Sequence, residues 1–319
     1  MLIQRRLKHK GTGGKNTESL AKSRKIRGDF ISRFGYVPYS VLKRIANDKA
    51  IDYSAKDRAY TKVSHEVLSK KDGLTDKQSQ KAFETAYRGV RSSNKGQVMA
   101  LSRFPQNVGK VLTRFYCPKG GVIYDPFAGH NSRMQLCYEL GRNYHGFDVS
   151  IQFMKANIRI RQQLYRMWKG TLIPNDCWIK LELKSSHWTG LPAGYADFTI
   201  TSPPYWDIEW YGDERDQLGR AKTYDEFLCS ISEHIKENYR VLKGGAYSCW
   251  CINDFRKSGE YYMYHSDIAN LGISVGFKIA AIYIIDLGIP AQNAFIQTIE
   301  RNKVFPKGHE YCVVFKKGG

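Results

Sequence analysis

Residues 125–131 combine residue types that suit the binding of a nucleotide. They read DPFAGHN and lie between an apolar strand pattern and a helix pattern. Doubly wound folds bind nucleotides at such strand-to-helix turns, where a glycine lets the backbone come close to the ligand. Gly129 provides this freedom, and Asn131 tolerates the left-handed conformation better than other non-glycine residues. A glycine turn that serves only close packing is the structural alternative.

An acidic residue follows this turn at the distance expected for ribose recognition. Asp148 ends the next apolar strand pattern, 19 residues after Gly129. A carboxylate about 20 positions beyond a glycine turn is placed to accept hydrogen bonds from both ribose hydroxyls of a nucleoside. The turn and the spaced acid together predict a cofactor that contains a nucleoside.

A second stretch, residues 201–206, has the chemistry to hold a base. It reads TSPPYW and follows a clear strand pattern. Two consecutive prolines fix φ and remove two N–H donors, which leaves a stiff rim of carbonyl acceptors. Together with the Ser202 hydroxyl, this rim can accept hydrogen bonds from an exocyclic amine, and Tyr205 offers a face for base stacking. A stiff turn whose aromatic side chains fill the core is the alternative, but a position at the ligand-binding edge of a sheet favours function.

Alternating strand and helix patterns place both stretches at the same edge of a sheet. The expected strands are 122–125, 144–148, 177–183, 196–201, 246–252, 277–285 and 309–315. The expected helices are 134–141, 151–168, a helix that starts at the Thr223/Glu226 capping box and stops at Gly244–Gly245, and 261–275. Repeated β-α units predict an α/β fold with a doubly wound, mostly parallel seven-stranded Rossmann-like sheet and helices on both faces. The last two strands have no helix between them, so we expect an antiparallel hairpin at one end.

The two motifs resemble those of the amino-group DNA methyltransferases that use S-adenosylmethionine. The motifs of that family read D-P-F-x-G-x-G and S/D/N-P-P-Y/F/W, and the similarity extends over roughly 103–316. The resemblance implies a methyltransferase sheet, S-adenosylmethionine as cofactor, double-stranded DNA as partner and no metal. It implies cofactor binding by Phe104, Asp125, Phe127, Gly129, Asn131 and Asp148. It implies that the target base is held by Ser202, Pro203, Pro204 and Tyr205.

The form of the second motif bears on which base is methylated. Ser-Pro-Pro-Tyr is commoner among family members that methylate N4 of cytosine, whereas Asp-Pro-Pro-Tyr is typical of N6-adenine enzymes. The resemblance therefore implies a site-specific DNA methyltransferase of the restriction-modification kind that acts on a flipped base, with cytosine N4 favoured. The alternatives are N6-adenine methylation, an RNA or protein amino-group methyltransferase, and a non-catalytic DNA-binding protein on this fold.

Three departures from the family pattern concern the cofactor pocket and the reading of DNA. His130-Asn131 stands where the family usually has a small residue and glycine. The acidic residue usually found next to the cofactor's adenine has no clear counterpart at 181–187, and no separate target-recognition insert is evident. By elimination, we expect recognition of the DNA sequence to involve 29–100 and the loops 207–222 and 286–302.

Charge divides the chain into parts. The 50 Lys and Arg against 30 Asp and Glu give a net charge of +20. Residues 1–100 hold 23 basic and 9 acidic side chains (+14), whereas 101–319 hold 27 and 21 (+6). This pattern favours a polyanion-binding extension over a merely solubilising tail. We expect a basic disordered arm at 1–28, a basic, DNA-contacting subdomain at 29–100 and a catalytic domain at 101–319.

Composition excludes several other classes of protein. No apolar run approaches the length of a membrane helix, and the basic N-terminus lacks a secretory signal or a convincing mitochondrial transit pattern. Seven scattered cysteines without a CxxC pair argue against a disulfide scaffold or a common zinc site. Cytosine C5 methylation needs a Pro-Cys pair, which is absent. We expect a protein of the bacterial or phage-infected cytoplasm that associates with the nucleoid through DNA.

Overall fold

The structure is a computed structural model that describes residues 17–34, 38–44, 104–167, 177–209, 214–288, 299, 303–305 and 307–319. The chain divides into two units, residues 1–39 and 40–319. In the first unit, helix α1 spans Thr17–Phe34. Residues 17–28 are therefore helical, which differs from the expected disordered arm. They contain no proline and no glycine before Gly28, and Leu, Ala, Lys and Arg are good helix formers. Residues 1–16, and most of the expected subdomain at 29–100, lie outside the described residues.

The second unit is built on an eight-stranded sheet with the order β1-β9-β10-β6-β5-β2-β3-β4. The strands are β1 (Val41–Lys43), β2 (Val122–Asp125), β3 (Asn143–Asp148), β4 (Ile179–Leu183), β5 (Ala196–Thr201), β6 (Leu242–Ile252), β9 (Lys278–Asp286) and β10 (His309–Lys316). All neighbouring pairs are parallel except those that β10 makes with β9 and β6. The expected mostly parallel sheet with an antiparallel end hairpin is confirmed.

Strand β1 is an eighth strand that the sequence patterns did not predict. Its three residues pair in parallel with β9, in the register Val41↔Ile284 to Lys43↔Asp286. Leu42 is buried, and the side chain of Asn107 donates a hydrogen bond to the Lys43 carbonyl at 2.5 Å. A strand of three residues is too short to show a periodicity, so only its partners identify it.

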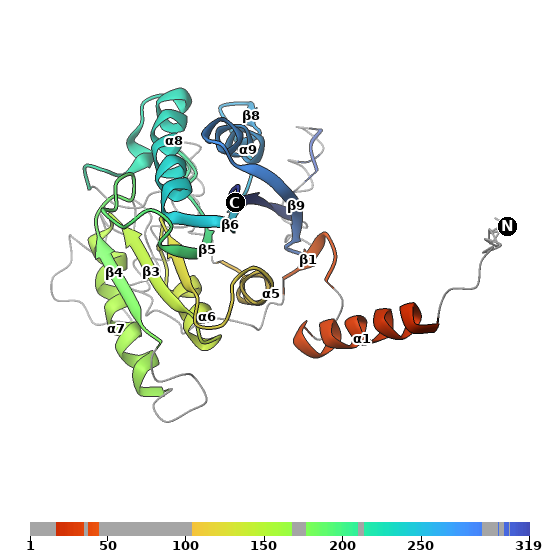
Figure 1. Ribbon diagram of the computed structural model, residues 1–319. Coiled ribbons are helices and arrows are strands. Elements are labelled where there is room, and N and C mark those ends of the chain that lie inside the picture. The colour runs from red at the N-terminus through yellow and green to blue at the C-terminus, as the bar shows by residue number, and fades with distance from the viewer. Residues whose placement is uncertain are drawn as a thin grey trace, which may run out of the picture. The chain divides into compact units, whose positions relative to one another are not determined.

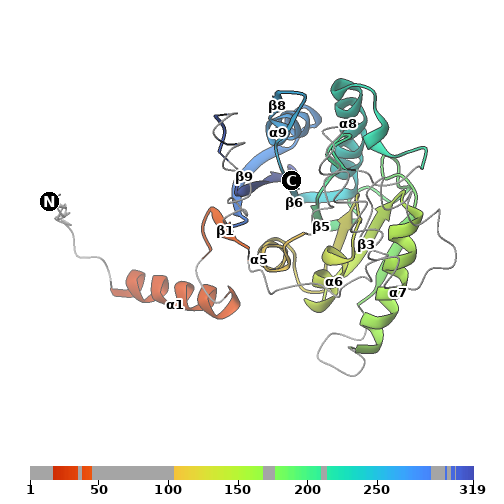
Figure 2. The same cartoon turned by 180° about the vertical axis from the view of Figure 1, so that it is seen from behind.

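Helices cover both faces of the sheet, as Figures 1 and 2 show. On one side lie α5 (Gln106–Tyr116), α6 (Ser132–Glu139) and α7 (Ile151–Met167), and on the other lie α8 (Tyr224–Val241) and α9 (Tyr264–Val275). A short 3-10 helix, η1 (Leu218–Arg220), precedes α8. Within the described residues, no helix is both long enough and apolar enough to cross a membrane.

Helix α8 shows how local sequence sets an element that carries part of the site. Thr223 is its N-cap, and the Thr223 hydroxyl accepts a hydrogen bond from the backbone N–H of Glu226 at 3.1 Å. Phe227, Ile231 and Ile235 recur every four residues and are fully buried. The helix ends at Val241 rather than at the glycine pair, because Leu242 already pairs with Ala196 in β5.

A small hairpin also differs from the expected order of elements. Strands β7 (Phe255–Lys257) and β8 (Glu260–Tyr262) pair antiparallel in a sheet of their own. Helix α9 therefore begins at Tyr264 rather than near 261. The aromatic rings of Phe255 and Tyr262 stack at 5.1 Å, a contact across the hairpin that a helix pattern does not reveal.

Candidate functional site

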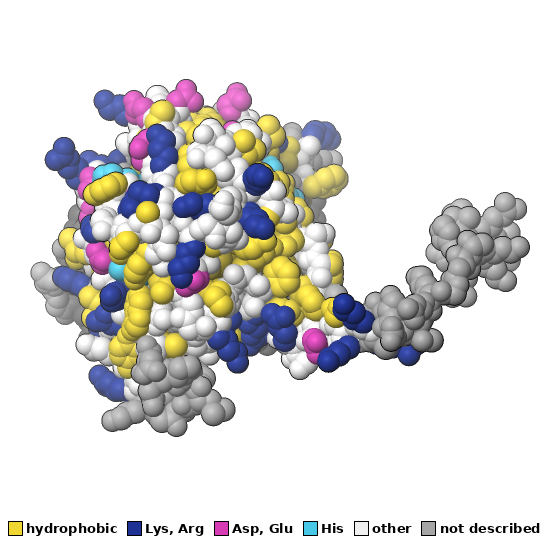
Figure 3. All heavy atoms as spheres, viewed as in Figure 1, with side chains coloured by type: hydrophobic (Ala, Val, Ile, Leu, Met, Phe, Trp, Pro, Cys, Tyr) yellow, Lys and Arg dark blue, Asp and Glu magenta, His cyan; other side chains and the backbone are white. Residues whose placement is uncertain are grey.

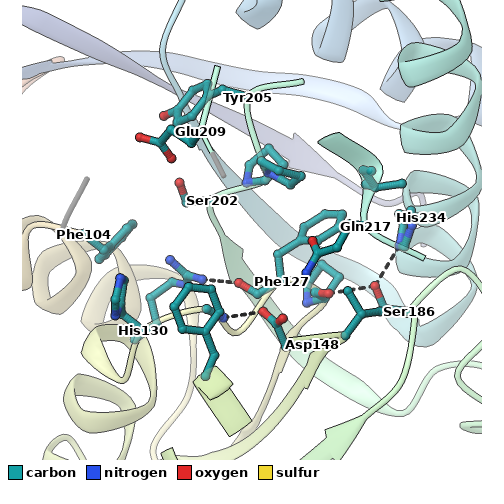
Figure 4. Close-up of a pocket in the computed structure, with 18 of the residues that line it drawn as sticks. Phe104, Phe127, His130, Asp148, Ser186, Ser202, Tyr205, Glu209, Gln217 and His234 are labelled. Atoms are coloured by element: carbon teal, nitrogen blue, oxygen red, sulfur yellow. Dashed lines mark hydrogen bonds between the residues drawn. The ribbon is translucent and has the colours of Figure 1, made fainter. Parts of the chain in front are cut away.

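A pocket lies at the carboxyl ends of β2, β3 and β5, where the chain leaves the sheet toward opposite faces. Its volume, including the open mouth, is about 970 Å³. Ligands of doubly wound sheets bind at this switch point. The walls include eight of the predicted site residues: Phe104, Phe127, Gly129, Asp148, Ser202, Pro203, Pro204 and Tyr205. Figure 4 shows side chains from both motifs around a common space.

The glycine turn holds its backbone through hydrogen bonds to neighbouring elements. Gly129 has φ of +47°, in the region that favours glycine. Its N–H donates to the Asp148 Oδ2 at 2.7 Å, and its carbonyl accepts from the Asn157 side chain at 2.8 Å. The turn and the end of β3 are therefore fixed relative to each other.

Asp148 is an acceptor whose environment disfavours its charge. Besides Gly129, its carboxylate accepts a hydrogen bond from the Ser150 N–H at 2.8 Å. Burial raises the pKa of Asp148 to about 6, although both backbone hydrogen bonds lower it. The carboxylate lines the pocket and is ionised at neutral pH, as an acceptor for two ribose hydroxyls must be.

Asp125, which the sequence placed against the cofactor, does not line the pocket. Its carboxylate is fully buried and accepts hydrogen bonds at 2.7 Å from Arg133, Tyr144 and Thr201. These partners come from α6, β3 and β5, so Asp125 joins the elements around the turn. Arg133 also donates to the carbonyl of Phe127, in the turn itself. We therefore assign Asp125 a positioning role.

Asn131 likewise differs from the expectation. It is the N-cap of α6 with φ of −58°, in the right-handed helical region, and Gly129 is the left-handed residue of the turn. Asn131 is almost completely buried, is absent from the pocket wall, and its amide lies 3.4 Å from the Gln135 side-chain oxygen. His130 takes a place in the wall instead, with its ring 4.8 Å from that of Phe153.

Phe104 lines the pocket just before helix α5, and Gly109 of that helix lies directly against its ring. Phe104 is 9% exposed, and the guanidinium of Arg133 lies 5.3 Å from its ring centre. A Cβ atom on Gly109 would lie 2.6 Å from the Phe104 ring and 2.5 Å from Leu136. Glycine is therefore required at this position for Phe104 to keep its place in the wall.

The Ser-Pro-Pro-Tyr motif forms the opposite wall and is held from outside. Tyr264 donates a hydrogen bond to the Pro204 carbonyl at 3.1 Å, and the rings of Tyr205 and Tyr264 meet edge to face at 6.1 Å. Trp206, with φ of +43°, carries backbone strain at the end of the motif. Its indole N–H donates to the Ala221 carbonyl at 2.9 Å, which anchors the strained residue.

Two acidic side chains line the same part of the pocket as Tyr205. Glu209 is 7% exposed, and Figure 4 shows it beside Tyr205 and Ser202. Glu310, at the start of β10, is 8% exposed, and burial raises its pKa. Both carboxylates act electrostatically on the hydroxyl of Tyr205, and burial raises the pKa of that hydroxyl well above its ordinary value. Sequence reasoning missed both acids, because neither belongs to a motif.

Sequence reasoning also missed a serine-histidine pair on another side of the pocket. This side is lined in part by the residues after β4, Lys184, Ser185 and Ser186. Ser186 follows β4 and His234 lies in the middle of α8. The Ser186 Oγ lies 2.7 Å from the His234 Nδ1, and Figure 4 draws this contact. Because 48 residues separate the two, no local pattern indicates the pair.

The residues present fit the cofactor that the resemblance implied. The pocket combines apolar rings with a few polar groups, as small-molecule sites do. Asp148 presents a carboxylate in the wall that could accept from a ribose, and Phe104 and Phe127 present apolar faces. Among the residues that the structure describes, no group of three or more His, Cys, Asp or Glu side chains is arranged to hold a metal ion.

The sheet and its pocket have the architecture of a doubly wound nucleotide-binding domain. A family model described as a DNA methylase, of the N6/N4 type, matches residues 19–159 and 196–319. The chain therefore belongs to the N6/N4 DNA methylase family and is an S-adenosylmethionine-dependent DNA amino-group methyltransferase. No curated protein matches its sequence.

Several solved structures are similar to this chain. An S-adenosylmethionine-dependent methyltransferase from Methanosarcina mazei has 12% sequence identity and a TM-score of 0.44, covering 68% of this chain and 99% of its own. A protein named as a candidate DNA modification methylase of Thermus thermophilus, complexed with S-adenosylmethionine, has 22% identity and a TM-score of 0.32. That match covers 40% of this chain and 50% of the Thermus chain.

Proposed function

We propose that this protein is a site-specific methyltransferase of double-stranded DNA that methylates the exocyclic N4 of a flipped cytosine. The observation that supports this most directly is the meeting of the two motifs. Gly129 and Asp148 line the same pocket as Ser202, Pro203 and Tyr205. A cofactor held by the first pair faces a base held by the other three.

The motif residues address the main difficulty of amino-group methylation. The lone pair of a base amine is delocalised into the ring, which makes the nitrogen a poor nucleophile. The Ser202 hydroxyl and the Pro203 carbonyl accept the two N–H groups and localise the lone pair toward the methyl donor. Two prolines hold these acceptors with little reorganisation, so orientation and fixed dipoles provide most of the catalysis.

A cofactor in this pocket would present its methyl group to the acceptor rim. S-adenosylmethionine, when bound, supplies a methyl group on a sulfonium whose sulfur is an excellent leaving group. Asp148 holds the ribose, and Phe104 and the Gly129 turn fix the remainder of the cofactor. After the nitrogen–carbon bond forms, the extra proton of the amine leaves to water.

Reaching the amine requires the base to leave the duplex, which costs a few kcal/mol. Stacking on Tyr205 offsets part of this cost, because base–aromatic stacking contributes roughly 1–3 kcal/mol. The basic first 100 residues supply attraction to the DNA backbone, and we assign the reading of sequence to 29–100 and the loops 207–222 and 286–302. These segments lie largely or partly outside the described residues.

The decisive experiment identifies the modified nucleoside. The protein is incubated with unmodified DNA and methyl-labelled S-adenosylmethionine, and the DNA is digested to nucleosides for mass spectrometry. We expect N4-methylcytosine, since the motif has Ser202 rather than aspartate. Detection of N6-methyladenine would mean instead that the same site methylates adenine. Label in competing RNA rather than DNA would contradict the proposed DNA substrate, and binding of DNA without binding of cofactor would indicate a non-catalytic protein.

A further inference from the structure

The pair formed by Ser186 and His234 has a defined hydrogen-bond direction. The Ser186 Oγ lies 2.7 Å from the Pro126 carbonyl and 2.7 Å from the His234 Nδ1. A carbonyl only accepts, so the single hydroxyl proton of Ser186 goes to Pro126. The His234 Nδ1 must then carry a proton and donate it to Ser186. This leaves the lone pair of the neutral imidazole on Nε2.

The Nε2 of His234 is an acceptor at the pocket wall. His234 lines the pocket and is 4% exposed, and within the described residues Nε2 has no hydrogen-bond partner. Its ring packs against Phe127, with ring centres 4.9 Å apart. Burial lowers the pKa of His234 to about 3, so the imidazole stays neutral in any ordinary buffer. An acceptor in the pocket wall that no described residue satisfies is available to a hydrogen-bond donor on a ligand.

The position of His234 in the pocket selects which part of the cofactor it meets, and this step rests on the proposed function. The sulfonium, which joins the methionine part of the cofactor to the ribose, must face Ser202 and Pro203, and Asp148 holds the ribose. In Figure 4, Phe104 lies across the pocket from Ser186 and His234, with Asp148 between them. We assign the methionine part to the Phe104 side of Asp148, which puts the adenine on the other side, beside His234.

We propose that the Nε2 of His234 accepts a hydrogen bond from the exocyclic amine of the cofactor's adenine, with Ser186 as the residue that fixes the tautomer. No acidic side chain from 181–187 competes for this role. Glu182, the one acid there, accepts hydrogen bonds from His145 at 2.7 Å and lies 3.0 Å from the Lys184 ammonium. The helix α8 thus provides an acceptor that the loop after β4 lacks.

The test compares two ligands by isothermal titration calorimetry on the full chain. S-adenosylhomocysteine carries the 6-amino group, and S-inosylhomocysteine has a carbonyl oxygen in its place. We expect the wild-type protein to bind the adenosyl compound about tenfold more tightly, the effect of one net hydrogen bond. The inosyl oxygen faces the Nε2 lone pair and gains nothing there.

Two substitutions at the same position separate the acceptor from the rest of the ring. His234→Asn keeps a donor for Ser186 and loses the acceptor, so the two ligands should bind within about twofold of each other. His234→Gln reaches the position of Nε2 with an amide oxygen and should restore preference for the adenosyl compound. His187→Asn serves as a control, because His187 is exposed and lies beside His234.

The outcomes distinguish this inference from the proposed function. Binding of S-adenosylhomocysteine by the wild type, with the same preference in His234→Asn, would overturn the role of His234 and leave the cofactor site intact. Failure of the wild type to bind S-adenosylhomocysteine at all would overturn both. Thermal melting of each variant shows whether a lost preference accompanies a lost fold.

Discussion

Tyr205 is the residue on which recognition of the base most depends. Its ring is held edge to face by Tyr264 and stays 8% exposed at the pocket wall. We expect Tyr205→Ala to lower kcat/KM for DNA methylation by about 10- to 100-fold, from the loss of stacking. The Kd for S-adenosylhomocysteine should change less than about twofold.

Tyr205→Phe is the matched control for this prediction. It keeps the ring and removes only the hydroxyl, so most of the methylation activity should remain. Equal losses of methylation and cofactor binding in Tyr205→Ala would show that the ring supports the cofactor pocket rather than the base.

The raised pKa of Asp148 predicts how cofactor binding depends on pH. Its pKa in the ligand-free protein is about 6, raised from 3.8 by burial, and only the ionised form accepts both ribose hydroxyls. We expect the Kd for S-adenosylhomocysteine to be flat above about pH 7 and to rise up to tenfold per pH unit below about pH 6. Calorimetry between pH 5 and 8 measures this.

The contribution of Asp148 to folding stability depends on pH in the opposite direction. A raised native pKa means that the ligand-free fold holds the proton more tightly than the unfolded chain. The contribution of Asp148 to stability is therefore fully present below about pH 3.8 and is lost as the pH rises through about 6. Asp148→Asn should bind S-adenosylhomocysteine weakly, with a Kd that does not change between pH 5 and 8. A pH dependence that persists in Asp148→Asn would show that another group causes it.

At the scale of elements, strand β1 closes the edge of the sheet at β9. The Ile284 N–H donates to the Ser40 carbonyl at 2.9 Å, and the Arg44 N–H donates to the Asp286 carbonyl at 2.9 Å. Removal of residues 1–44 leaves these backbone groups of β9 without partners. It also removes the buried Leu42 side chain, whose burial contributes about 1.5–3 kcal/mol to stability. We expect the melting temperature to fall by about 5 °C or more.

Removal of residues 1–39 is the matched truncation, because the compact unit that contains the sheet begins at Ser40. This shorter deletion should leave the melting temperature within about 2 °C of the full chain. Equal melting temperatures for the two truncations would mean that β1 adds nothing to the sheet. An exposed β9 edge should also increase aggregation, which light scattering detects.

At the scale of the whole molecule, most of the excess positive charge, +14 of +20, lies in the first 100 residues. On the face shown in Figure 3, Lys and Arg side chains are dispersed among acidic, polar and apolar ones. Residues 1–28 alone hold nine Lys and Arg and one acid. Deletion of 1–28 should weaken DNA binding and flatten the plot of log K against log salt, by about 0.9 for each phosphate that this segment neutralises.

Fluorescence anisotropy over a series of salt concentrations measures this slope. The cofactor affinity of the deletion variant should match the full chain, because every wall residue of the pocket lies beyond residue 103. An unchanged slope would mean that residues 1–28 do not touch DNA.

The elements with regular patterns were predictable because their signals are local. The strands 122–125 and 196–201 have the predicted bounds, and the Thr223 cap marks the start of α8. The prolines of 203–204 and the glycine at 129 act on their own backbone, so their turns also follow from the sequence. Strand β1 and the β7–β8 hairpin were missed because each strand has three residues.

By itself, the sequence determined the class of fold and the two motifs, since both depend on residues that are close along the chain. Only the tertiary structure decided what individual polar groups do. Asp125 and Asp148 both end strands, yet one is enclosed by three donors and the other faces the pocket. Sheet order and helix packing bring His234 to Ser186 and Glu310 to Tyr205 across long stretches of chain. Such proximity depends on which elements become neighbours, and no local pattern encodes that choice.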